Sequence, residues 1–219
     1  MATRPQLKHA IRASCEIISQ PGVIVIGSQA ILATWSDDEL PYVATRSDEL
    51  DICPLRDDDS ASLAMALAGA AGEWSLFHET HGFYIDGVGL KTPVLPGGFE
   101  ERLVAVSDED TRGYVGYCLD PHDLCVAKLA ANRDKDREFV GSLVEHRIVG
   151  PRVIDERLCW TALDDVRLAA SRSFLAEHVQ RWNILDIVPE EPSDSLGKDL
   201  QLPCLPQVLE ASTEPTREP

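Results

Sequence analysis

Two acidic residues, Glu49 and Asp51, have the types and spacing that best fit a chemical role in this sequence. They alternate with Leu50 and Ile52 in a short segment. Because side chains alternate between the two faces of a β-strand, both carboxylates would lie on one face, about 6–7 Å apart. Neighbouring carboxylates repel each other unless a cation lies between them. A divalent ion such as Mg²⁺ prefers oxygen ligands and keeps coordination sites for phosphate oxygens. The pair therefore predicts a metal site.

The dipeptide Gly27-Ser28 forms a second candidate site. It follows the apolar run 23–26 and precedes an expected helix over residues 29–35. Glycine permits a close backbone approach, and a serine hydroxyl with the free N–H groups of a helix N-terminus can bind a phosphate. A glycine-serine pair is often only a helix cap, and an acid pair is often only a solvated face. Their combination indicates a metal held beside a phosphate-bearing ligand.

A single lysine, Lys128, interrupts the otherwise apolar segment 124–131. A helix that is apolar on all sides is buried, and a buried amine needs a partner. Asp136 continues the same helical stripe further along the chain. Two interpretations are open. The amine either reaches nucleotide phosphates or the acids of the strand, or it extends along the helix surface to water.

The elements that position these residues follow from the pattern of apolar residues. The β-branched run 23–26 is typical of a buried central strand, and residues 5–20 have the spacing of an amphipathic helix. Further strands are expected at 50–54, 82–89, 93–95, 102–107 and 114–119, the last two as a hairpin, with helices at 57–71, 121–132, 136–148, 154–166 and 171–185. The sequence predicts an α/β (α+β) fold, in which a small mixed sheet with flanking helices precedes a C-terminal helical unit.

Three regions are expected along the chain. Residues 1–120 would form the α/β core, and residues 121–185 a helical unit packed on it. Residues 186–219 are rich in Pro, Glu, Asp and Ser, a composition that predicts a disordered acidic tail.

Charge and hydropathy exclude several classes of protein. The chain has 219 residues and a formal net charge of −17, from 20 Lys and Arg against 37 Asp and Glu. A protein that binds duplex phosphates usually carries a basic patch, so we do not expect binding to an extended duplex. No apolar run approaches the roughly 18 residues of a membrane span, and no secretory signal is recognisable. We therefore expect a cytoplasmic protein.

The cysteine and histidine residues predict no zinc centre. The six cysteines form no CxxC pair, and without export a disulfide framework is not expected. His78 and His81 lack both the HExxH spacing and a third ligand. The aromatic residues around them, including Trp74 and Phe77, are expected to form core around a turn.

The order of these motifs resembles the nucleotidyltransferase superfamily with a DNA polymerase β-like core. In that family, an apolar segment and a glycine-serine turn precede an acid-x-acid strand. Residues 44–51 are similar to this strand and its approach in the AbiEii-type branch. The segment 124–131, followed by Asp134-Lys135-Asp136, resembles the branch's second motif. The resemblance covers roughly residues 20–150 and is nearest to DUF6036-type proteins. Glu49 departs from the pattern, because many members have Asp there.

The resemblance implies a magnesium-dependent site. Glu49 and Asp51 would hold Mg²⁺ together with a third carboxylate on a neighbouring strand. Asp86 is our candidate for this third ligand, with Glu100 and Glu101 as alternatives. Gly27, Ser28 and Lys128 are implied in binding a nucleoside triphosphate, and Lys128 also in neutralising charge. Asp136 is implied in orienting Lys128 or the acceptor.

The implied activity is transfer of a nucleoside monophosphate from a nucleoside triphosphate to an acceptor. Related proteins act as toxins of bacterial toxin–antitoxin pairs, so a cognate antitoxin or another protein partner is expected. RNA, a protein or a small molecule stay open as acceptors, although the acidic surface argues mildly against a large RNA. The alternative is a catalytically inactive binding module of the same fold that acts through a partner protein. The glutamate at position 49 and the lack of a basic surface favour that alternative.

Overall fold

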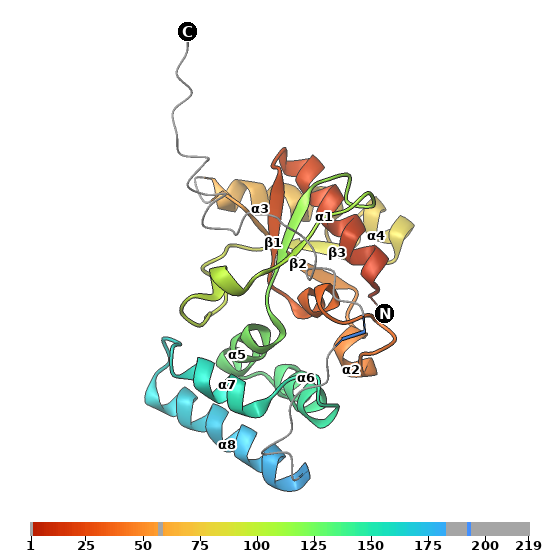
Figure 1. The fold of residues 1–219 in the computed structure, drawn as a ribbon. Helices are drawn as coiled ribbons and strands as arrows, with labels where there is room; N and C mark the ends of the chain where they lie inside the picture. The colour runs from red at the N-terminus through yellow and green to blue at the C-terminus, as the bar shows by residue number, and fades with distance from the viewer. Residues whose placement is uncertain (1, 57–58, 183–191, 194–219) are drawn as a thin grey trace.

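A five-stranded mixed sheet forms the centre of the protein (Figure 1). The computed structural model describes residues 2–56, 59–182 and 192–193. The sheet has the order β3-β2-β1-β5-β4, in which β1–β5 and β2–β3 are parallel and β1–β2 and β4–β5 are antiparallel. The strands are β1 (Gly22–Val25), β2 (Glu49–Pro54), β3 (Tyr84–Gly87), β4 (Val104–Val106) and β5 (Val115–Cys118). The predicted α/β fold with a small mixed sheet is confirmed.

The two strands that the sequence indicated most clearly lie side by side. All four residues of β1 are buried, as expected for an apolar central strand. In β2, Leu50 and Ile52 are fully buried, whereas Glu49 and Asp51 are partly exposed. The alternation predicted for β2 is therefore confirmed, and it places both carboxylates on one face.

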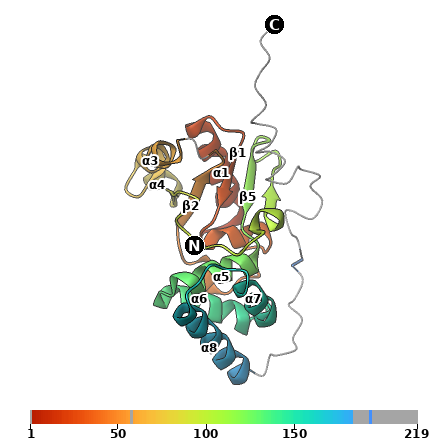
Figure 2. The same cartoon turned by 90° about the vertical axis from the view of Figure 1, so that its left-hand side faces the viewer.

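Helices α1 (Arg4–Ile18), α3 (Ser60–Ala71) and α4 (Leu76–His81) flank the sheet. A capping box between Thr3 and Gln6 begins α1, whose buried side packs on the strands and on α3. Helix α3 packs on β2 and β3, and Figure 2 shows α3 and α4 on one side of the sheet. These helices bury the face of β2 that carries Leu50 and Ile52.

Four further helices gather at one end of the sheet (Figure 2): α5 (Pro121–Ala131), α6 (Asp134–Glu145), α7 (Pro151–Leu158) and α8 (Asp165–Trp182). Asp120 caps α5, and Pro121 occupies its first turn. Helix α5 contacts the short helix η1 (Ser28–Ala33), and α6 contacts α2 (Tyr42–Thr45). Two short segments that flank β1 and β2 thus join the sheet to the helices.

Four local predictions about helices were wrong, and one of them is the helix expected at 154–166, which forms α7 and ends at Leu158. The segment after Gly27 is the 3₁₀ helix η1 rather than an α-helix, and residues 42–45, for which no helix was predicted, form the single turn α2. Helix α8 begins at Asp165 rather than at residue 171. The carboxylate of Asp164 accepts a hydrogen bond from the backbone N–H of Arg167, so this acid caps the helix earlier than the apolar pattern indicated.

The segments around residues 74–96 also differ from expectation. Residues 93–95 form no strand, and nearby only Pro96 takes part in an isolated bridge, with Thr161. Proline lacks the N–H group that a ladder needs, which explains the interruption. Trp74, expected in the core, is 82% exposed and has a positive φ of 64°. Ser75 accepts a hydrogen bond from the N–H of His78 and begins α4 where a turn was expected.

Two expectations concern membranes and the C-terminus. None of the helices in the described residues has the length and apolar character that spanning a membrane requires. The predicted disordered tail, residues 186–219, lies outside the described residues except for 192 and 193. There, the backbone N–H of Ser193 donates a hydrogen bond to Glu39.

Candidate functional site

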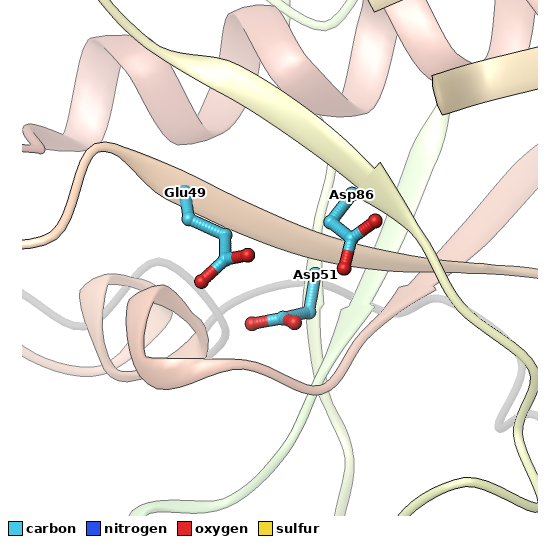
Figure 3. A group of neighbouring side chains, drawn as sticks. All are labelled: Glu49, Asp51 and Asp86. Atoms are coloured by element: carbon cyan, nitrogen blue, oxygen red, sulfur yellow. The ribbon is translucent and has the colours of Figure 1, made fainter. Parts of the chain in front are cut away.

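Three carboxylates meet where β2 and β3 run side by side (Figure 3). The parallel register pairs Asp51 with Asp86, and Glu49 shares their face because it lies two residues before Asp51. One oxygen from each of the three side chains lies within 4.8 Å of the others. The structure therefore brings together the two acids predicted from the strand and the candidate third carboxylate. The alternatives to Asp86, Glu100 and Glu101, lie in the short helix η2 (Phe99–Arg102).

Gly27 lies directly against this acidic cluster. A Cβ atom at position 27 would lie 1.7 Å from Oδ2 of Asp51 and 2.5 Å from its Cγ. The backbone of Gly27 is extended, with φ −79° and ψ −174°, so the position requires space rather than an unusual conformation. Glycine at this position leaves Asp51 the room to reach Glu49 and Asp86.

The electrostatic environment of Asp51 is unfavourable for its negative charge. Burial, followed by the negative charge of Glu49, raises the pKa of Asp51 from 3.8 to about 6. Asp86 acts in the same direction, whereas Lys128 and Lys135 favour the ionised form. The opposing lysines do not cancel the repulsion, so the cluster is expected to attract a further cation.

Lys128 and Asp136 come together across the α5–α6 corner. Lys128 Nζ lies 3.3 Å from the carboxylate of Asp136 and 5.6 Å from the ring centre of Phe139. Arg133 Nε lies 2.6 Å from the same carboxylate. Burial alone would raise the pKa of Asp136, but the hydrogen bond from Arg133 and the charge of Lys128 hold it below its usual value. The Lys128 side chain is only 14% exposed, so it does not simply extend to water.

All seven residues predicted for the site line one cleft of about 880 Å³ between the sheet and the helices. With Lys128, five basic residues line this cleft, although the chain as a whole is acidic. They come from four separate parts of the chain: Arg46, Lys128, Arg133, Lys135 and Arg167. The acidic cluster thus shares its cleft with enough positive charge to attract an anionic ligand.

A comparison with models of protein families identifies the family of this chain. A family model described as "Nucleotidyltransferase of unknown function (DUF6036)" matches residues 6–157. The chain belongs to the DUF6036 nucleotidyltransferase family. The matched region contains every element that carries the three carboxylates, Gly27 and Lys128. No curated protein and no solved structure matches the chain.

The donor set of this DUF6036 protein fits a divalent metal. Nucleotidyltransferase-like families usually use such an ion, and the cluster offers three carboxylates without sulfur or nitrogen ligands. Oxygen-only sets suit hard ions such as Mg²⁺. The space kept free at Gly27 and the raised pKa of Asp51 are the further features expected where a cation completes the site.

The remaining residues of the cleft divide into predicted and missed ones. Ser28, predicted to bind phosphate, is partly exposed, begins η1 and lines the cleft. Arg46 and Arg167, which the sequence reasoning missed, pair at the rim with Glu138 at 2.7 Å and with Asp164 at 3.6 Å. Sequence spacing gave no signal for them, because α2 and α8 reach the cleft only through tertiary packing.

Proposed function

We propose that this DUF6036 protein is a magnesium-dependent nucleotidyltransferase that moves a nucleoside monophosphate from a nucleoside triphosphate to an acceptor hydroxyl. The observation that carries the proposal is the cluster of Glu49, Asp51 and Asp86 in a cleft that also holds five basic side chains. In such a reaction the acceptor oxygen forms a bond to the α-phosphorus, the bond to the β-phosphate breaks, and pyrophosphate leaves. The hydroxyl proton passes to a base or to water.

Glu49, Asp51 and Asp86 would hold Mg²⁺ at the sheet. The bound ion would neutralise phosphate oxygens and make the acceptor hydroxyl easier to deprotonate. Gly27 would keep Asp51 in place by leaving room for its carboxylate. Because Mg²⁺ binds the ionised form, it would also lower the raised pKa of Asp51.

The basic side chains would bind the phosphates. Lys128 and Arg133 share the single carboxylate of Asp136, so their combined charge exceeds that of their partner by one. Asp136 would hold both cations toward the cleft, where they would neutralise charge on the departing pyrophosphate. The hydroxyl of Ser28 would donate a hydrogen bond to a phosphate oxygen.

The test is calorimetric titration of Mg²⁺ with a nucleoside triphosphate into the wild type and into Asp51→Asn. We expect binding to the wild type and strongly weakened binding to the variant, because the amide removes one negative ligand. Asp155→Asn, at an exposed ion pair with Arg172, is the control and should bind as the wild type does. Equal affinities for the wild type and Asp51→Asn would contradict the metal site. In that case, the catalytically inactive binding module would be the better supported function.

A second test uses the space at Gly27. Gly27→Ala should weaken binding of Mg²⁺ and nucleotide, because the new methyl group displaces the carboxylate of Asp51. Gly69→Ala is the matched control, since a Cβ at position 69 of α3 meets no atom within 4 Å. Unchanged binding by Gly27→Ala would show that Asp51 does not need its observed position.

The toxin role that the family resemblance implies forms a finer part of the proposal. Expression of the chain alone in a bacterial host should arrest growth, and Asp51→Asn should relieve the arrest. The acceptor can then be sought by following the labelled α-phosphate into RNA, protein or small molecules. Equal growth arrest by the wild type and Asp51→Asn would mean that toxicity does not depend on nucleotidyl transfer.

A further inference from the structure

The half of β2 that carries the acidic residues extends beyond the end of β1. The β1–β2 ladder ends where Val25 pairs with Ile52, because the chain then turns at Gly27-Ser28. Glu49 and Asp51 therefore pair with β3 on one side but lie past the last pair with β1 on the other. A strand end that is held along one edge opens more easily, so contacts on the other edge matter for the position of these acids.

Two hydrogen bonds connect this edge of β2 to the turn. The backbone N–H of Ile26 donates to the carbonyl oxygen of Asp51 at 3.1 Å. Three residues later, Nε2 of Gln29 donates to the carbonyl oxygen of Ser47, also at 3.1 Å. The two bonds lie on either side of the turn in one segment and on either side of Glu49 in the other. They hold the turn that would bind phosphate against the strand that would bind metal.

Ser47 connects Gln29 to the first acid of the strand. The hydroxyl of Ser47 accepts a hydrogen bond from the backbone N–H of Glu49 at 3.2 Å. Ser47 is partly buried and lines the cleft, whereas Gln29 is fully buried and does not line it. Gln29 therefore acts on the site from behind, through Ser47.

Gln29 costs the fold stability that an apolar residue would not cost. Its Oε1 is buried and has no hydrogen-bond partner among the residues that the structure describes. The amide cannot turn round, because Oε1 would then face the carbonyl oxygen of Ser47, and both atoms are acceptors. Burying an unpaired amide oxygen is unfavourable, so packing alone would favour methionine or leucine at this position. The contact with Ser47 is therefore what explains a glutamine here.

We propose that Gln29 is a positioning residue of the metal site, whose side chain holds the start of β2, and with it Glu49, against the turn. The inference rests on the proposed function, because it assigns Glu49 to a metal. Glu49 is the first residue of β2, so a looser Ser47 would let its carboxylate move away from Asp51 and Asp86. Removing the partners that support metal ligands typically lowers metal affinity by about 10–100-fold.

The experiment is titration of Mn²⁺ alone, without nucleotide, into the full chain as wild type, Gln29→Met, Ser47→Ala and Gln20→Met. Methionine has about the length of glutamine, and it removes both the donor and the unpaired Oε1. Gln29→Met should weaken Mn²⁺ binding by about tenfold, because the start of β2 loses its side-chain anchor. Ser47→Ala keeps the carbonyl and removes only the hydroxyl, so it should weaken binding in the same direction by a smaller factor.

Gln20 provides the matched control at the opposite end of β2. It is also buried, and its Oε1 accepts hydrogen bonds from the backbone N–H groups of Leu55 and Arg56 at 2.8 and 3.4 Å. Gln20→Met leaves both groups without this acceptor, so it should lower the midpoint of thermal unfolding at least as much as Gln29→Met does. Its Mn²⁺ affinity should equal that of the wild type, because Gln20 does not hold the acidic end of the strand.

The outcomes separate the two proposals. If the wild type does not bind Mn²⁺, both the proposed function and the role of Gln29 are overturned. If the wild type binds and Gln29→Met binds equally well, only the role of Gln29 is overturned. Equal losses of affinity in Gln29→Met and Gln20→Met also overturn it, because affinity would then follow stability. If Gln29→Met does not fold, Ser47→Ala decides: reduced Mn²⁺ affinity supports the role of Gln29, and unchanged affinity overturns it.

Discussion

Two groups of acidic side chains lie in this protein, and they differ in how their charge is balanced. Asp123 on α5 is fully buried, but Arg102 contacts both of its oxygens at 2.8 and 3.1 Å, and Arg157 lies at 2.9 Å. The neighbouring Asp120 also pairs with Arg157. In contrast, Lys128 and Lys135 do not offset the effects of burial and of Glu49 on Asp51, and its pKa is raised to about 6. Burial would raise the pKa of Asp120 as well, but hydrogen bonding to His122 and the charge of Arg157 lower it to about 2.

The difference separates acids that hold the fold together from acids that are ready for a ligand. The arginines around Asp120 and Asp123 join η2, α5 and α7 within the folded chain. The acids on β2 and β3 repel each other in the absence of a ligand. Acidic residues at functional sites often have raised pKa values for this reason. Burial alone would not have distinguished the groups, because Asp123 is the more buried residue.

The largest expected effect comes from removing the most buried acid. Asp123→Ala should destabilise the fold by about 3–5 kcal/mol, because Arg102 and Arg157 lose their shared partner. The free energy of unfolding, measured with urea, checks this value. Asp155→Ala, at an exposed pair with Arg172, should cost much less, because water screens that pair. Similar losses of stability in both variants would contradict this prediction, since burial of the ion pair would then not matter.

Asp51→Asn should have the opposite effect on stability. The gap between 3.8 and about 6 means that the ionised carboxylate costs the folded state up to ~3 kcal/mol at neutral pH. The folded state binds this proton more tightly than the unfolded state does, so the cost appears as pH rises from about 4 to 6. Without metal, Asp51→Asn should therefore be more stable than the wild type at pH 7, and the two should converge near pH 4. An equal difference in unfolding free energy between the two proteins at both pH values would contradict the prediction that the charge of Asp51 destabilises the fold.

The pKa of Asp120 is shifted in the opposite direction, so its charge should stabilise the fold. Its pKa is lowered from 3.8 to about 2, so its contribution of ~2 kcal/mol is present above about pH 4 and is lost as pH falls toward 2. Asparagine also caps helices well, so Asp120→Asn should retain α5 while removing the charge. We expect the stability difference between wild type and variant to disappear in strong acid. A constant difference from pH 5 to pH 2 would show that the charge of Asp120 contributes nothing.

The smallest of these effects concerns the cations of the cleft. Lys128→Met should keep the fold and weaken nucleotide binding by about tenfold, the value of one hydrogen bond to a charged group. Asp136 keeps Arg133 as a partner, so little stability should be lost. The matched control is Lys8→Met, because Lys8 is 16% exposed and pairs with Asp108, and neither residue lines the cleft. If calorimetry gives equal nucleotide affinities for both variants, Lys128 serves only the fold.

Local patterns predicted the parts of the site that depend on one strand or one helix. The alternation of Glu49 and Asp51 with apolar residues identified β2 and its exposed face. The apolar run before Gly27 identified β1, and a single lysine in an apolar helix identified Lys128. Helix α4 was missed because its aromatic and histidine residues have no simple periodicity, and only the cap at Ser75 indicated its start.

Residue types establish where the charges lie along the chain, and backbone periodicity establishes which of them share a face of a strand or helix. Which charges meet follows only from the packing of the folded chain. The register of β2 with β3 pairs Asp51 with Asp86, and the packing of α6 and α8 brings Arg133 and Arg167 to the same cleft. The structure also decided that Asp123 meets two arginines and Asp51 meets other acids. Contacts between segments depend on how the hydrophobic core orders the chain, and no local spacing encodes that order.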